Sequence, residues 1–168
     1  MKEYKFQEKR FFPADPARVF ACLDDLSVTG MHMSQSSMPM MGGKMELEFL
    51  STQKTGLGTR YQWTGQVLWW KLDFTVAVTK WIEGSEKTWQ TEGDAQLILY
   101  SAFKMHLYVH LVTGGSEAFL SISYDLPNGF FQKLLCRIAG GWYARWCLKN
   151  MLRDAAAKLA APGTIAHA

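Results

Sequence analysis

Hydrophobic and polar residues alternate over much of the chain up to residue 125, and this pattern predicts β-strands. The alternation has a period of two in seven stretches, at residues 4–11, 45–49, 61–67, 72–79, 88–92, 99–112 and 118–124. Turn sequences, among them Gly114 and Gly115, separate neighbouring stretches. Strands joined in this way form hairpins, so we expect one antiparallel sheet with one apolar face.

Helical signals interrupt the strands once near the N-terminus. Asp15 suits an N-cap and Pro16 suits the first helical position, because that backbone N–H has no partner within a helix. Apolar residues then recur at helical spacing, at Val19, Phe20, Leu23 and Leu26. Residues 27–41 predict a second short helix that ends in a loop. Asp24 and Asp25 end the first helix, where we expect both carboxylates to be hydrated.

One long helix is predicted from residue 130 to about residue 160. Its expected apolar stripe consists of Phe131, Leu134, Leu135, Ile138, Trp142, Leu152, Ala156 and Leu159. Gly140 and Gly141 lie near its middle, where each glycine costs about 1 kcal/mol relative to alanine. We therefore expect either a bend or space left for a bulky group at this point.

Three local motifs accompany this order of elements: A-D-P-A-R-V-F at 14–20, T-G-L-G-T-R-Y at 55–61 and Y-D-L-P-N-G at 124–129. Together they resemble the START-like superfamily, also called SRPBCC or the polyketide cyclase/dehydrase and lipid-transport group, from about Tyr4 to Leu159. The resemblance implies an α+β helix-grip fold (β-α-α-β6-α), in which a curved seven-stranded antiparallel sheet wraps around a long C-terminal helix. It implies a single domain over residues 1–160, followed by a disordered tail at 161–168.

Composition excludes several classes of protein. With 48% hydrophobic and 20% charged residues, the chain is neither disordered nor collagen-like, and a net charge of +3 does not indicate nucleic-acid binding. It has no secretory signal, no stretch able to span a bilayer, and three cysteines without a C-x-x-C motif. We therefore expect a cytoplasmic protein with free thiols, without membrane insertion, as a monomer or weak homodimer.

The resemblance implies an apolar cavity between sheet and helix, for which a hydrophobic small molecule is the expected partner. The candidate lining residues are Met33, Met38, Met41, Phe49, Tyr61, Trp63, Phe74, Phe103, Met105, Leu107, Tyr124, Ile138, Trp142 and Arg145. The alternative is that these side chains pack solidly and leave no space for a ligand.

Arg145 and Lys149 are unexpected near the apolar stripe of the long helix. If buried, one of them would need an anionic ligand or an acid such as Asp73 or Glu92. The alternative is that a bend at the glycine pair directs both side chains to water.

The methionine-rich segment 31–41 supports two hypotheses. Flexible thioethers suit an adaptable lid at the cavity mouth, whereas thioether and imidazole groups together suit Cu(I). His106 and His110 lie in a predicted strand, about 13 Å apart on the polar face, which is too far for them to share an ion. We therefore assign no metal and no cofactor.

The leading functional hypothesis is binding or transport of a lipid-, polyketide- or aromatic-like molecule. An alternative is an aromatase/cyclase-type enzyme with Tyr61, Tyr124 or Arg145 as a proton donor or oxyanion stabiliser. A second alternative is a protein-binding module similar to Hsp90-ATPase activators. No catalytic motif is present, so we assign no catalytic residue.

Overall fold

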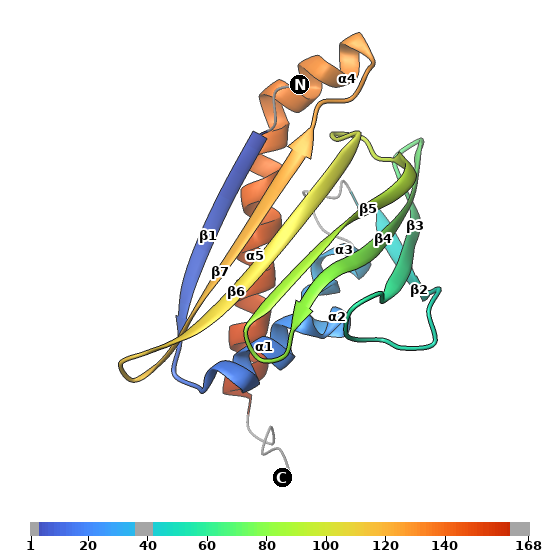
Figure 1. Ribbon diagram of the computed structural model, residues 1–168. Helices are drawn as coiled ribbons and strands as arrows, with labels where there is room; N and C mark the ends of the chain where they lie inside the picture. Colours follow the sequence, from blue (N-terminus) through green and yellow to red (C-terminus); the bar gives the residue numbers. More distant parts are fainter. Residues whose placement is uncertain (1–3, 36–41, 162–168) are drawn as a thin grey trace.

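The structure, a computed structural model, describes residues 4–35 and 42–161. Seven antiparallel strands form one sheet in the order β1-β7-β6-β5-β4-β3-β2. Their bounds are β1 (Tyr4–Phe12), β2 (Lys44–Phe49), β3 (Arg60–Val67), β4 (Trp70–Ile82), β5 (Glu86–Gln96), β6 (Ala102–Val112) and β7 (Gly115–Asp125). The predicted helix-grip α+β fold is confirmed, with the sheet curving around a long helix (Figure 1).

The helices lie on one side of the sheet (Figure 1). Their bounds are α1 (Pro16–Asp24), α2 (Leu26–Thr29), α3 (Met31–Ser34), α4 (Phe130–Leu135), the π turn η1 (Cys136–Gly140) and α5 (Gly141–Ala160). Helices α1 to α3 connect the two edge strands, β1 and β2, and contact α5. The space between α5 and the curved sheet therefore has α1 to α3 along one side.

The predicted helix start is confirmed. The backbone N–H of Arg18 donates to the Asp15 carboxylate at 3.1 Å, and Pro16 is the first helical residue. Asp25 ends α1 and caps α2 by accepting from the Ser27 N–H at 2.8 Å. Two short helices, α2 and α3, lie where we expected one.

Several strand boundaries differ from those expected. Strand β6 begins at Ala102, so residues 97–101 form a connection instead of part of a strand. The hairpin turn between β6 and β7 falls one residue earlier than expected, because Gly115 already pairs with Val112. Gly114 is the turn residue with the left-handed conformation, at φ +83°. Strand β5 is longer than expected, and two register shifts in its pairing with β4 add twist to the sheet.

The long helix is irregular where the glycine pair predicted it. A Cβ on Gly140 would lie 3.0 Å from the Tyr124 hydroxyl, and a Cβ on Gly141 would lie 2.8 Å from the Phe6 ring. Glycine is therefore required by close packing of the sheet against the helix.

The first half of the predicted apolar stripe is wrong. Phe131, Leu134 and Ile138 are exposed, because α4 projects beyond the sheet. Leu135 and Trp142 are also exposed, although both still line the cavity between the sheet and the helices. The buried side chains on α5 are instead Ala144, Leu148, Asn150, Met151, Leu152 and Ala155.

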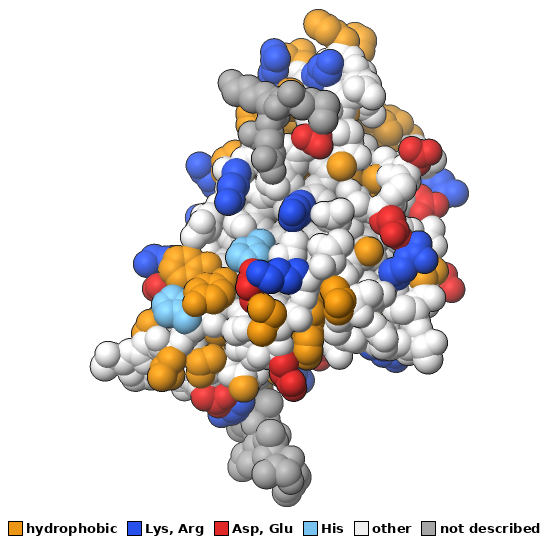
Figure 2. Space-filling view, viewed as in Figure 1, with side chains coloured by type: hydrophobic (Ala, Val, Ile, Leu, Met, Phe, Trp, Pro, Cys, Tyr) orange, Lys and Arg blue, Asp and Glu red, His pale blue; other side chains and the backbone are white. Residues whose placement is uncertain are grey.

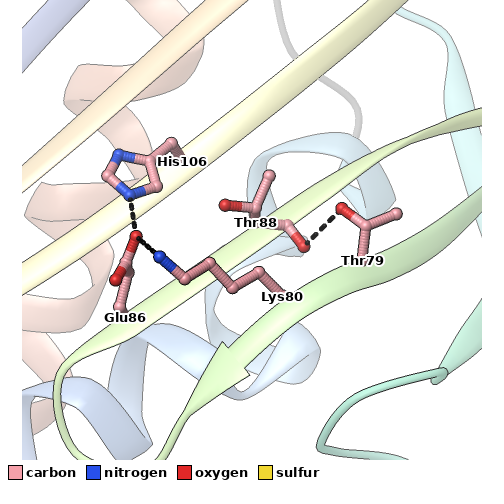
Figure 3. Close-up of polar contacts among 5 residues, drawn as sticks. All are labelled: Thr79, Lys80, Glu86, Thr88 and His106. Atoms are coloured by element: carbon pink, nitrogen blue, oxygen red, sulfur yellow. Dashed lines mark hydrogen bonds and ion pairs between the residues drawn. The ribbon is translucent and has the colours of Figure 1, made fainter.

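The outer face of the sheet carries a polar cluster (Figure 3). The Glu86 carboxylate accepts from Lys80 Nζ at 2.7 Å and lies 2.8 Å from His106 Nε2. These two contacts lower the pKa of Glu86. His106 thus lies on the polar face, as expected, and is remote from the interior.

Candidate functional site

A cavity of about 260 Å³ lies between the sheet and the helices. An engineered cavity of about 150 Å³ is already large enough to bind benzene, so this one has space for a larger molecule. Its walls come from α1 to α3, from strands β3 to β7, from the β5–β6 connection and from the long helix. Most of the wall is apolar, with Trp63, Phe74, Trp89 and Met105 on the sheet side.

Half of the candidate residues lie on this wall. They are Met33, Tyr61, Trp63, Phe74, Phe103, Met105 and Trp142. Met38 and Met41 lie outside the described residues.

Three other candidates are not on the wall, although they are inside the protein. Phe49 packs against Tyr61, with ring centroids 6.2 Å apart. Leu107 is fully buried in the core. Tyr124 stacks on Tyr100, with ring centroids 4.1 Å apart. Phe49 and Tyr124 thus support the cavity wall through their contacts with two of its residues.

Two candidates face outward, and their placement on the cavity wall was wrong. Ile138 is exposed because it lies on the projecting half of the helix. Arg145 is also exposed, with its guanidinium 5.0 Å from the centre of the Phe6 ring. Of the two alternatives left open for Arg145, the structure therefore shows the one in which its side chain reaches water.

The proposed acidic partners of Arg145 are occupied elsewhere. Asp73 accepts from Gln62 at 2.6 Å, and Glu92 pairs with Arg60 at 2.6 Å. Lys149 is exposed as well and lies 4.0 Å from Glu8.

The main polar feature of the wall is a buried ion pair that the sequence pattern did not lead us to expect. Lys87 lines the cavity, and its Nζ lies 2.6 Å from Asp24 Oδ1. The side chains of Lys87 and Asp24 are only 4% and 6% exposed. Asp24 also accepts from the Trp81 indole N–H at 3.1 Å. The expectation that Asp24 is hydrated was therefore wrong.

Burial lowers the pKa of Lys87, and the neighbouring Asp24 carboxylate opposes that effect. The sequence did contain an indication that the Lys87 side chain points inward. Lys87 and Trp89 are two residues apart in one strand, so an inward Trp89 implies an inward Lys87. The predicted strand began at residue 88, which hid this relationship.

His32 is the second buried polar group on the wall. Its Nδ1 atom has no hydrogen-bond partner among the described residues, and its ring meets the Trp146 ring edge-on at 5.4 Å. Burial lowers the pKa of His32 to about 4, so the imidazole is neutral near pH 7. The neutral imidazole can therefore form a hydrogen bond with a bound molecule without adding a charge to the cavity.

The hydroxyl and thiol groups on the wall hold their protons firmly. Burial raises the pKa of Tyr61 and Tyr143 and raises that of Cys147 to about 12. All three cysteines are free. These groups are therefore neutral across the physiological pH range.

Metal-binding clusters and membrane spans are both missing from the part of the chain that the structure describes. Among those residues, no group of three or more His, Cys, Asp or Glu side chains is arranged to hold a metal ion. None of the described helices combines the length and the apolar character needed to cross a membrane.

Comparison with solved structures supports the fold. TTHA0849 from Thermus thermophilus is 16% identical, with a TM-score of 0.66, covering 92% of this chain and 99% of that protein. Ara h 8.0201 is 15% identical, with a TM-score of 0.55 and coverage of 93% and 99%. CV1439 from Chromobacterium violaceum is 13% identical, with a TM-score of 0.59 and coverage of 92% and 95%.

No family model and no curated protein matches this chain. The structural likenesses agree with the START-like resemblance at the level of architecture. At these identities they show the fold alone, and the function has to be argued from the cavity.

Proposed function

We propose that this protein binds or carries a hydrophobic small molecule in the cavity between the sheet and the long helix. The observation that carries this proposal is the cavity itself, about 260 Å³ in volume, bounded by aromatic and aliphatic side chains. An apolar pocket with a few convergent polar groups is typical of a small-molecule site.

Lys87 defines the polar end of the proposed ligand. An ammonium group has three donors and no acceptor, so it favours an oxygen acceptor on the ligand. Its charge is already balanced by Asp24 at 2.6 Å. A carboxylate ligand would add an uncompensated negative charge to this buried place, which is costly. We therefore favour an uncharged head, such as a carbonyl or hydroxyl, on an apolar body.

The pKa values favour binding over proton transfer. A general acid or base works best with a pKa near the operating pH. The pKa of Tyr61 is raised and that of His32 is lowered to about 4, both by burial. Arg145, another candidate of the cyclase hypothesis, is exposed. The cyclase-type enzyme therefore remains the weaker alternative.

A displacement assay tests the proposal. The purified protein is titrated with the uncharged fluorescent probe N-phenyl-1-naphthylamine, and decanol or decanoic acid is added as a competitor. We expect saturable binding of the probe and displacement at lower concentrations of decanol than of decanoic acid. Native mass spectrometry of protein purified from its own host would identify a retained ligand.

A matched pair of substitutions tests whether the probe binds in the cavity. Ala139 lines the cavity, whereas Ala157 is exposed on the same helix away from it. Ala139→Phe fills part of the space and is expected to weaken probe binding at least tenfold, whereas Ala157→Phe leaves it unchanged. No saturable binding by the wild type, or equal losses in both variants, would overturn the proposal.

A further inference from the structure

The projecting end of the long helix exposes an unusual amount of apolar surface. None of the six residues of α4 is buried. Phe130 is 77% exposed and Phe131 is 82% exposed. In Figure 2, hydrophobic side chains gather at the end of the molecule formed by α4, with basic side chains next to them.

A second exposed apolar group lies at the turn between β3 and β4. The turn residues are Leu68 and Trp69, because Val67 pairs with Trp70. Leu68 has a φ of +54° and Trp69 is 73% exposed. Glycine, asparagine and aspartate are the usual residues at such a turn. Two large apolar residues here therefore have no explanation in the folding of the hairpin.

Both groups border the mouth of the same cavity. Trp70 lines it from the β3–β4 side, and Leu135 and Trp142 line it from the helix side. All three side chains are also exposed to solvent. The apolar residues on the surface are thus continuous with the apolar wall inside, and we call this continuous face the mouth surface.

The charge of the mouth surface is positive. Residues 126–142, which run from the end of the sheet to Trp142, contain two cationic residues and no Asp or Glu. Lys133 and Arg137 are exposed at its projecting end, and Lys71 is exposed next to Trp70. None of these three has an acidic partner within 4 Å among the described residues. The mouth surface therefore combines unpaired cations with exposed aromatic rings.

We propose that the mouth surface docks the protein on an anionic lipid bilayer. Exposed Phe, Trp and Leu side chains enter the boundary between head groups and acyl chains, and Lys and Arg bind anionic head groups. Such peripheral attachment needs no spanning helix. A symmetric contact with a second copy is disfavoured, because the same surface of both chains would meet and bring the Lys133 and Arg137 cations of both copies into one interface.

Docking in this orientation places the cavity mouth against the lipid. An apolar ligand then moves between bilayer and cavity without crossing water, which avoids the cost of exposing its surface. This role in ligand exchange rests on the proposed function, whereas the attachment itself does not.

Vesicle flotation tests the attachment. The protein is mixed with phosphatidylcholine vesicles that contain or lack phosphatidylserine, at low and high salt. We expect binding to the phosphatidylserine vesicles, weakened by salt because exposed charges are screened. Phe131→Ser should reduce the partition coefficient by about tenfold or more, since it removes a large apolar group from the lipid boundary.

Leu111→Ser is the matched control, because Leu111 is 71% exposed at the far end of β6. It should leave vesicle binding unchanged. Failure of the wild type to bind anionic vesicles, or equal losses in both variants, would overturn the docking proposal. So would sedimentation showing a dimer that Phe131→Ser dissociates.

Binding of N-phenyl-1-naphthylamine without vesicles separates this proposal from the proposed function. Phe131 does not line the cavity, so Phe131→Ser should retain probe affinity. Loss of vesicle binding with intact probe binding supports docking. Absence of probe binding with intact vesicle binding refutes the cavity function alone.

Discussion

The hydroxyl of Tyr100 donates a hydrogen bond to the carbonyl oxygen of Gly140 at 2.9 Å, and both residues are buried. This bond joins the β5–β6 connection to the π turn of the long helix. Both elements contribute to the cavity wall, through Tyr100 itself and through Ala139. The bond therefore holds two sides of the cavity at a set separation.

Tyr100→Phe should lower the free energy of unfolding by about 1–2 kcal/mol, because a buried hydrogen bond is lost while the ring is kept. Urea unfolding followed by tryptophan fluorescence measures the change. Tyr108→Phe is the control, since Tyr108 is partly exposed on the outer face of β6. Equal stabilities of the wild type and Tyr100→Phe would contradict this role of the bond.

The Lys87–Asp24 pair offers a double-mutant test. Lys87→Met leaves the Asp24 carboxylate buried, with the Trp81 N–H as its one side-chain hydrogen-bond donor among the described residues. We expect a loss of about 3–5 kcal/mol, which is typical of breaking a buried ion pair from one side. Adding Asp24→Leu should restore most of this stability, although it leaves the Trp81 N–H unpaired.

Chemical denaturation of the wild type, both single variants and the double variant gives the coupling energy. Additive losses would show that the two side chains do not interact in the folded protein.

Arg145→Met tests the position of Arg145 on the outer face. Its guanidinium contacts the Phe6 ring, an exposed cation–π contact with an expected contribution of about 0.5–1 kcal/mol. We expect a stability loss of that size and an affinity for N-phenyl-1-naphthylamine within about twofold of the wild type. A large drop in affinity would mean that Arg145 reaches the cavity after all.

Local patterns were sufficient to predict most of the architecture. The strands, the Asp15 cap and the glycine pair depend on neighbouring residues, which a single sequence displays. The phase of the long helix was not predictable in the same way. The glycine pair indicated an irregularity near Gly140, but not that a π turn at Cys136–Gly140 changes which side chains after it face the sheet. Arg145 was misplaced for that reason, and Ile138 because it lies on the projecting half of the helix.

The candidate site was harder to predict than the fold because it depends on residues far apart in the chain. Lys87 is inward only because Asp24, 63 positions earlier, meets it there. An isolated lysine in a strand more often faces water, so its burial was visible only through its spacing from Trp89. The aromatic wall was easier, since Tyr61, Trp63 and Phe74 share the apolar face by simple alternation.

His32 should make stability depend on pH. Burial is the main cause that lowers its pKa from 6.5 to about 4, and the Asp154 carboxylate opposes this shift. Between these two values the unfolded chain binds more protons than the folded protein. The free energy of unfolding therefore falls as pH decreases from about 6.5 to 4 and is unaffected by His32 above that range. The full effect of such a shift is ~3 kcal/mol.

His32→Phe keeps a ring beside Trp146 and removes the titration. We expect the difference in stability between the wild type and this variant to shift in favour of the variant as pH decreases from 7 to 4.5. His106→Gln changes an imidazole that is partly exposed on the outer face, and it should retain the contribution of His32. Urea unfolding midpoints of all three proteins, measured at both pH values, test this prediction. If the difference between the wild type and His32→Phe is the same at both pH values, His32 takes up a proton in the folded protein as easily as in the unfolded chain.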